Sequence, residues 1–243
     1  MIQVYSLEHA LYEDPVNITR WLAEHQIDIR HIRLFEGHPL PDPEMVDLLI
    51  IMGGPMNIYE EEEFSWLAGE KQFIRAVINA GTPVLGICLG GQLIADVLGG
   101  TVNRARQPEY GWHTVTRIPG VPVFSRKETG TESILFPEVI KVFQWHQDTF
   151  SIPPGSIPLY QSELCRNQAF IYNNRVIGLQ FHPEMDQPTI RGFLAQSIQE
   201  IYEKNLVNTR DDIITRIDLC SDGRIFIAGL LEYLVKFGKE KTG

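Results

Sequence analysis

One cysteine lies between glycines in the stretch GICLGGQ, residues 86–92. An apolar segment with the length of a strand precedes it. A segment with apolar residues at helical spacing follows it, until two glycines end the pattern. This order predicts a strand, a sharp turn and a helix, with Cys88 on the turn. It is the cysteine counterpart of the G-x-S-x-G nucleophile elbow, in which Gly86 and Gly90 leave room where larger side chains would collide.

The predicted position of Cys88 suits a nucleophile. At the N-terminus of a helix, unpaired N–H groups and the helix dipole favour a thiolate over a thiol. The same helix start offers the N–H of Leu89 as a hydrogen-bond donor for an oxyanion. The alternative is structural, because a free cysteine at the end of a buried strand is often only a small apolar side chain.

A thiol that attacks an acyl group needs a base, and the base needs a group that orients it. The segment FHPE, residues 181–184, ends an apolar run, which predicts a place at the carboxyl end of a strand, where sites of α/β proteins form. His182 and Glu184 are two residues apart, so in an extended chain both side chains point the same way and the carboxylate can hold the imidazole. The alternative is a turn that carries a surface ion pair.

Three other histidines are candidates for the same role: His9, His113 and His146. His146 is the strongest of them, because it also ends a predicted strand and Asp148 follows it two residues later. The residues alone leave the choice between the two pairs open.

A second glycine motif, GGP at residues 53–55, closes a continuous apolar run over residues 46–52. Such a run is typical of a strand buried on both faces of a parallel sheet. Glycines at its end let backbone N–H groups point into a cleft, although a simple chain reversal would use the same residues.

The elements that must position these residues alternate along the first hundred positions. Strands are predicted at residues 2–7, 27–35, 46–52 and 84–87, and helices at residues 15–26, 64–79 and 92–98. This layout predicts an α/β fold with a doubly wound, mostly parallel central sheet flanked by helices.

After residue 100 the pattern changes to short β-rich segments split by Pro and Gly, which predict added antiparallel strands. Residues 190–204 predict an amphipathic helix that packs back on the sheet, and two further helices are predicted at 211–219 and 222–237. We therefore predict one domain over residues 1–200, with residues 201–243 as a helical C-terminal extension packed on the same domain.

Composition excludes several classes of protein. The 243 residues are 44% hydrophobic and 21% charged, as in ordinary globular proteins. The net charge of −10 and the scattered Lys and Arg argue against a nucleic-acid partner. No apolar run reaches the ~18 residues of a membrane span, and the N-terminal segment lacks the pattern of a signal peptide. The three cysteines, Cys88, Cys165 and Cys220, match neither a disulfide framework nor a zinc motif, so we expect a reducing, cytoplasmic setting.

Together, GICLGGQ, MGGP at residues 52–55 and FHPE, in this order and spacing, resemble the class I (triad) glutamine amidotransferase family. The resemblance covers roughly residues 1–200 and is closest to the glutaminase domain of GMP synthetase and free-standing proteins similar to it. It implies a catalytic triad of Cys88, His182 and Glu184. It also implies an oxyanion hole formed by the backbone N–H groups of Gly54 and Leu89.

The resemblance further implies how the α-amino and α-carboxyl groups of a bound glutamine are held. The residues that it assigns to this role are Gln92, Trp145, His146, Gln147 and Asp148. His146 is then a neighbour of the substrate and not the base. The sequence departs from the family at Gln147, where many members have glycine.

The reaction implied by the resemblance is hydrolysis of a γ-glutamyl amide, most simply of L-glutamine to glutamate and ammonia, through a glutamyl thioester. It requires no metal and no organic cofactor. Three alternatives stay open: a γ-glutamyl peptide hydrolase with an acceptor side near Trp112, Trp145 and Gln147; a glutaminase subunit that feeds ammonia to a separate synthase chain; and a binding protein with an inactive triad. The segment after residue 200 contains no Gly-rich phosphate loop, so we expect any synthase to be a partner chain.

Overall fold

Strands that are buried along their whole length form the centre of the computed structural model, which describes residues 2–121, 125–128, 131–134 and 136–242. They are β1 (Val4–Glu8), β3 (Leu48–Ile51), β4 (Val84–Ile87) and β11 (Val176–Leu179). Their mostly apolar sequences suit strands that helices cover on both faces. Together with β2 (Ile29–Arg33) they form the parallel part of one sheet, in the order β2-β1-β3-β4-β11.

The same sheet continues with antiparallel strands. The short strands β10 (Ala169–Tyr172) and β9 (Ile157–Gln161) follow β11, and the long strands β5 (Val102–Arg117) and β8 (Val139–Phe150) complete nine strands. A separate hairpin joins β6 (Ser125–Glu128) to β7 (Thr131–Ile134). The predicted fold, a doubly wound sheet with a parallel centre and added antiparallel strands, is confirmed.

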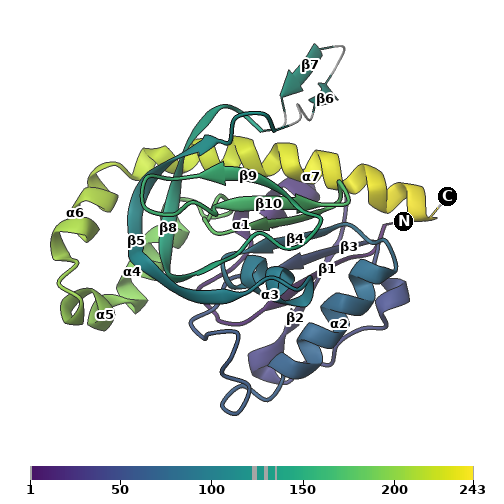
Figure 1. Ribbon diagram of the computed structural model, residues 1–243, viewed down its shortest axis with the longest axis horizontal. Helices are drawn as coiled ribbons and strands as arrows, with labels where there is room; N and C mark the ends of the chain where they lie inside the picture. The colour runs from purple at the N-terminus through teal and green to yellow at the C-terminus, as the bar shows by residue number, and fades with distance from the viewer. Residues whose placement is uncertain (1, 122–124, 129–130, 135, 243) are drawn as a thin grey trace.

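Helices cover both faces of the sheet (Figure 1). One face carries α2 (Leu67–Asn79) and α3 (Leu89–Val97), and the other carries α1 (Val16–Glu24) and the long helix α7 (Cys220–Thr242). Each layer buries its own set of apolar side chains against the sheet. The two ends of the chain lie close together at one side of the molecule (Figure 1).

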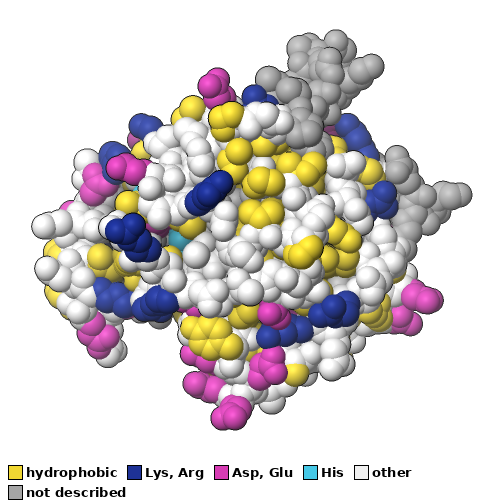
Figure 2. All heavy atoms as spheres, in the orientation of Figure 1, with side chains coloured by type: hydrophobic (Ala, Val, Ile, Leu, Met, Phe, Trp, Pro, Cys, Tyr) yellow, Lys and Arg dark blue, Asp and Glu magenta, His cyan; other side chains and the backbone are white. Residues whose placement is uncertain are grey.

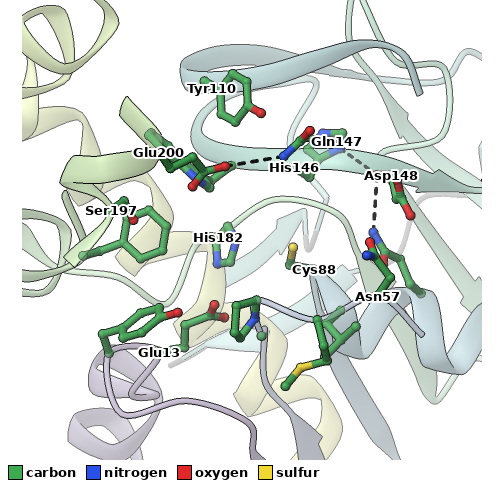
Figure 3. Close-up of a pocket in the computed structure, with 18 of the residues that line it drawn as sticks. Glu13, Asn57, Cys88, Tyr110, His146, Gln147, Asp148, His182, Ser197 and Glu200 are labelled. Carbon is green, nitrogen blue, oxygen red and sulfur yellow. Dashed lines mark hydrogen bonds between the residues drawn. The ribbon is translucent and has the colours of Figure 1, made fainter. Parts of the chain in front are cut away.

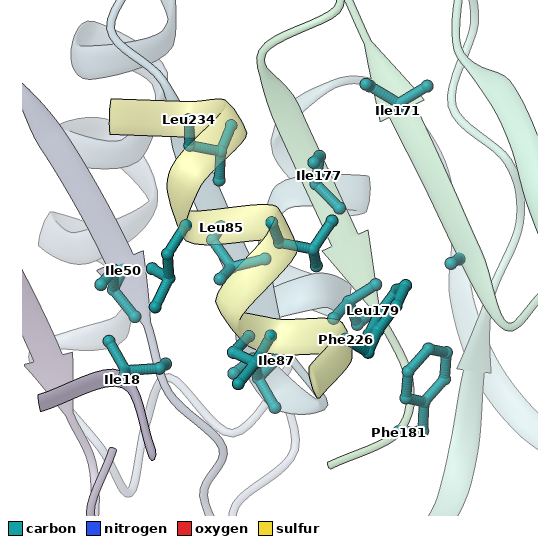
Figure 4. Packing of buried hydrophobic residues seen from close by; sticks show 14 of the residues in the cluster. Ile18, Ile50, Leu85, Ile87, Ile171, Ile177, Leu179, Phe181, Phe226 and Leu234 are labelled. Carbon is teal, nitrogen blue, oxygen red and sulfur yellow. The ribbon is translucent and has the colours of Figure 1, made fainter. Parts of the chain in front are cut away.

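Helix α7 is part of the main hydrophobic core. In Figure 4 its side chains Phe226 and Leu234 lie over the sheet residues Ile50, Leu85 and Leu179. All five are at most 5% exposed. Burial of one such side chain stabilises a protein by about 1.5–3 kcal/mol. The packing of α7 on this face of the sheet therefore stabilises the arrangement of the parallel strands.

Three shorter helices, α4 (Gln187–Gln196), α5 (Ile198–Glu203) and α6 (Val207–Thr215), lie at the end of the sheet formed by β5 and β8 (Figure 1). The prediction of one continuous helix over residues 190–204 is wrong, because the helix is interrupted at Ser197, which ends α4 and precedes α5. The break lets both helices bury apolar side chains around Trp112 and Phe143.

The boundaries of the last helices also differ from the prediction. The segment predicted at 211–219 is split into α6 and a 3₁₀ turn, η3 (Ile217–Leu219), and the last helix begins at Cys220 rather than at residue 222. Two further 3₁₀ turns are η1 (Leu34–Glu36) and η2 (Pro43–Met45). The division of the chain near residue 200 stays a prediction.

On the face shown in Figure 2, Lys and Arg side chains lie scattered, and Asp and Glu side chains lie mostly along the lower and left edges. The chain as a whole has a net charge of −10. In the part of the chain that the structure describes, no helix combines the length and the apolar character needed to span a membrane.

Candidate active site

Cys88 lies on the predicted sharp turn between β4 and α3. Its backbone has a φ of 51° and a ψ of −106°, a conformation that L residues rarely adopt and that stores strain. The turn is tight: a Cβ added to Gly86 would lie 2.4 Å from the carbonyl oxygen of Gly90, and one added to Gly90 would lie 2.2 Å from that of Ile51. The glycines around Cys88 are therefore required by backbone packing, as the sequence predicted.

His182 follows the carboxyl end of β11, and its backbone N–H donates to the carbonyl oxygen of Phe143 at 2.9 Å. Its Nδ1 lies 2.8 Å from Oε1 of Glu184, and both side chains are buried. Because a carboxylate only accepts hydrogen bonds, Nδ1 carries a proton and the other ring nitrogen is left for Cys88. The three residues predicted as a triad thus lie together, and Figure 3 shows two of them, Cys88 and His182, beside the cavity. Their catalytic roles stay a prediction.

The charge state of His182 follows from its surroundings. Burial alone would lower the pKa of His182, but the charges of Glu184 and Cys88 and hydrogen bonds to both side chains raise the pKa well above its usual value. An imidazolium beside a cysteine favours the thiolate, which is the nucleophilic form. The arrangement therefore fits attack on an electrophilic carbon.

The other three histidines do not compete for this role. His146 uses Nδ1 for the carbonyl oxygen of Asp148 and Nε2 for Glu109, each at 2.9 Å. His113 lies away from the cavity, with Nε2 at 3.2 Å from the carbonyl oxygen of Tyr110. His9 uses Nδ1 for the carbonyl oxygen of Gly53 and Nε2 for a carboxylate. His182, by contrast, forms a side-chain hydrogen bond to Cys88, which is one of the causes that raise the pKa of His182.

A cavity of about 300 Å³ opens beside Cys88 (Figure 3), within the size of small-molecule sites. Both residues predicted for the oxyanion hole, Gly54 and Leu89, line it. All the residues predicted to hold glutamine line it as well: Gln92, Trp145, His146, Gln147 and Asp148.

Gln180 was missed by the sequence reasoning and contacts the nucleophile. Its Nε2 donates to Sγ of Cys88 at 3.7 Å, and its Oε1 accepts from Nε2 of Gln92 at 3.3 Å. The side chain is completely buried, so both contacts are shielded from water. The available signal was a polar residue within the apolar run of residues 176–181.

Glu13, also missed, faces the cavity from the loop between β1 and α1 (Figure 3). Its carboxyl group packs on Gly53, where an added Cβ would lie 1.8 Å from Oε2 of Glu13 and 3.3 Å from Cε1 of His182. This Oε2 is buried and has no hydrogen-bond partner among the described residues. Burial raises the pKa of Glu13 to about 7, against the lowering effect of the His182 charge. The site therefore contains a second carboxyl group beside the imidazole.

Helices α4 and α5 supply the wall opposite Asp148, through Phe193, Ser197 and Glu200. Glu200 accepts hydrogen bonds from Nε1 of Trp145 at 3.1 Å and from Nε2 of Gln147 at 3.4 Å (Figure 3). The side chain of Gln147 thus ties β8 to α5.

The expected acceptor side near Trp112 needs a correction. Trp112 does not line the cavity; it is buried under α6 and donates from Nε1 to the carbonyl oxygen of Ile213 at 3.1 Å. Tyr12 and Tyr110 line that side of the cavity, together with the predicted Trp145. Among the described residues, no group of His, Cys, Asp and Glu side chains is arranged to hold a metal ion.

Known proteins resemble this chain in sequence and in fold. The sequence model of the family described as "Glutamine amidotransferase class-I" matches residues 4–196. A glutamine amidotransferase-like protein of Salmonella typhimurium is 28% identical over 207 residues, which are 82% of this chain and 83% of that protein. One subunit of the glutamine-hydrolysing GMP synthase of Saccharolobus solfataricus is 37% identical over 151 residues, which are 60% of this chain and 72% of the relative.

A similar solved structure is the crystal structure of a glutamine amidotransferase from Thermotoga maritima. It superposes with a TM-score of 0.85 at 30% sequence identity, and the match covers 97% of this chain and 98% of that one. The similarity therefore extends over the helices that follow residue 196, beyond the family match.

Proposed function

This chain belongs to the glutamine amidotransferase class-I family, and from that premise we propose that it hydrolyses the side-chain amide of L-glutamine to glutamate and ammonia, with Cys88 as nucleophile. The observation that carries the proposal is the hydrogen-bonded series from Glu184 through His182 to Cys88 on a strained turn. A base that is oriented by a carboxylate and bonded to a nucleophile is the arrangement that acyl transfer needs.

In the first half of the reaction, the thiolate of Cys88 attacks the amide carbon and the carbonyl oxygen becomes an oxyanion. The N–H groups of Gly54 and Leu89 donate to that oxygen, and one such donor contributes about 10²–10³ in rate. The imidazolium of His182 gives its proton to the nitrogen as the carbon–nitrogen bond breaks. Ammonia leaves, and a glutamyl thioester with a neutral His182 remains.

In the second half, His182 takes a proton from water and the resulting hydroxide adds to the thioester carbon. The carbon–sulfur bond breaks, glutamate leaves, and the thiolate and imidazolium are restored. Glu184 holds the ring of His182 in one orientation through both halves.

A second candidate substrate is a γ-glutamyl compound with a larger amine as leaving group. It is supported by the extent of the cavity, which continues past Trp145 to Tyr12, Tyr110 and Phe193. Aromatic side chains of this kind bind apolar groups with defined geometry. A third possibility rests on the relatives that are named as one subunit of a glutamine-hydrolysing GMP synthase: the ammonia would pass to a separate synthase chain.

Release of glutamate by the purified chain tests the proposal, with L-glutamine and a panel of γ-glutamyl dipeptides as substrates. Turnover of glutamine that disappears in Cys88→Ala supports the glutaminase function. Turnover of the dipeptides but not of glutamine would identify the protein as a hydrolase of γ-glutamyl compounds with larger leaving groups. Turnover of glutamine only after a synthase chain is added would identify a protein that depends on its partner.

A further inference from the structure

His9 lies directly after β1, at the carboxyl edge of the sheet, and makes two buried hydrogen bonds. Its Nδ1 lies 2.9 Å from the carbonyl oxygen of Gly53, and its Nε2 lies 2.8 Å from Oε1 of Glu70 in α2. The side chains of His9 and Glu70 are both completely buried. The reaction described above uses neither residue, although a buried ionisable pair of this kind is costly to maintain.

The positions of the protons on His9 follow from its partners. A carbonyl oxygen only accepts, so Nδ1 must carry a proton and donate it to Gly53. Nε2 faces the carboxylate of Glu70. Burial alone would lower the pKa of His9, but the charge of Glu70 and the hydrogen bonds to Glu70 and Gly53 raise this pKa above its usual value. Glu70 therefore orients the ring, and His9 holds the carbonyl of Gly53.

That carbonyl belongs to the same peptide unit as the N–H of Gly54. A peptide unit is planar and trans, so its C=O and its N–H point in opposite directions. We propose that the His9–Glu70 pair fixes this peptide so that the N–H of Gly54 points into the cavity, which makes His9 a positioning residue of the oxyanion hole. The inference rests on the proposed function, because the oxyanion forms in that reaction.

Glycines at both positions explain why the peptide needs such a contact. Without side chains, Gly53 and Gly54 allow many backbone conformations, and rotation of the peptide between them would turn the N–H away from Cys88. Crowding helps to hold Gly54, where an added Cβ would lie 2.6 Å from Sδ of Met56 and 2.8 Å from Cβ of His9. Within the described residues, no backbone carbonyl accepts from the N–H of Gly54, so this donor is not used by the fold's own backbone hydrogen bonds.

The test compares three variants of the full chain. The double variant His9→Leu/Glu70→Leu removes the contact without leaving one buried charge alone, and apolar replacement of a buried pair is often tolerated. Glu70→Gln keeps a partner for Nε2, so a neutral His9 can still donate from Nδ1. His9→Gln is measured in parallel in case the double variant does not fold. Its terminal amide takes the place of Nε2 and can bond Glu70, but it leaves the carbonyl of Gly53 without the donor that Nδ1 supplies.

Three measurements separate positioning from folding. For the double variant and for His9→Gln we expect kcat to fall by about 10²–10³, the effect of one lost oxyanion donor, with little change in KM. The affinity of the aldehyde analogue glutamate γ-semialdehyde, which adds to Cys88 and creates an oxyanion, should fall in parallel. Alkylation of Cys88 by iodoacetamide, which creates no oxyanion, should keep its rate. The variant Glu70→Gln should show a much smaller fall in kcat and in the affinity of the aldehyde.

A folded double variant, or a folded His9→Gln, with the kcat and the aldehyde affinity of the wild type would overturn the inference. An equal loss in alkylation would also overturn it, since the variants would then damage the turn itself. Failure of the proposed function is a different result, in which the wild type shows no turnover of any γ-glutamyl amide. The affinity of the aldehyde could then still be compared between the wild type and the variants.

Discussion

Oxygen Oε1 of Glu184 lies 2.8 Å from Nδ1 of His182, and both side chains are buried. The carboxylate both orients the ring and stabilises its charged form. A change of Glu184→Gln keeps the shape and removes the charge. We expect kcat for glutamine to fall by up to about 10⁴-fold, as when the acid of an analogous triad is replaced by its amide. Steady-state kinetics against the wild type check this; an unchanged kcat would contradict the role given to Glu184.

The pH profile of the same variant is a separate prediction. The charge of Glu184 contributes to the raised pKa of His182, and activity requires the imidazolium that protonates the leaving nitrogen. Activity is therefore lost as the pH rises through the pKa of His182. Without the carboxylate this pKa is lower, so the alkaline limb of kcat against pH should move to lower pH in Glu184→Gln. If the alkaline limb of the profile stayed at the same pH in Glu184→Gln, a group other than His182 would control the loss of activity.

Glu13 should make the folded protein less stable as the pH rises. Its pKa is about 7 in the folded chain and ordinarily 4.5, so between these values the unfolded chain has released a proton that the folded chain still holds. The free energy of unfolding then falls with rising pH, by about 3 kcal/mol over the window. In Glu13→Gln this contribution is absent.

Urea unfolding of both proteins at several pH values between 4.5 and 8 measures the effect. The stability of Glu13→Gln relative to the wild type should increase across this range. A difference that does not change with pH would mean that Glu13 ionises as an ordinary surface carboxylate does.

The backbone strain at Cys88 predicts a difference between two inactive variants. Cys88→Ala and Cys88→Gly both remove the thiol, but only glycine adopts a φ of 51° without strain. The strain is of order 1–3 kcal/mol, and the greater flexibility of glycine in the unfolded chain offsets about 0.5–1 kcal/mol of it. We expect Cys88→Gly to be about 1 kcal/mol more stable than Cys88→Ala in denaturant unfolding. Greater stability of the alanine variant would contradict a strained turn.

Two glycine-to-alanine changes should have opposite effects. A Cβ at Gly90 would lie 2.2 Å from the backbone of Ile51, which cannot move without displacing β3, so Gly90→Ala should destabilise the protein by about 3 kcal/mol. Gly69 lies in α2 with nothing within 4 Å of an added Cβ. Gly69→Ala is the matched control and should stabilise by about 0.5–1 kcal/mol. Thermal unfolding measures both; similar values for the two would contradict the tight elbow.

The sequence by itself determined the local parts of this protein. The turn at Cys88 could be predicted because its requirements, two glycines, a strand before and a helix after, are met by neighbours in the chain. The pairing of His182 with Glu184 could be proposed for the same reason, since two residues of extended chain put both side chains on one side. The parallel centre of the sheet followed from continuous apolar runs.

Only the tertiary structure decided which histidine faces the thiol and what surrounds the site. His9 and His146 are occupied by Glu70 and Glu109, which are 61 and 37 residues away in the chain, and no local pattern indicates such partners. The break at Ser197 that brings α5 against the cavity likewise depends on packing between distant segments. Hydrogen bonds between residues far apart in sequence arise only when the sheet has assembled, and they determine which partners each histidine of the site has.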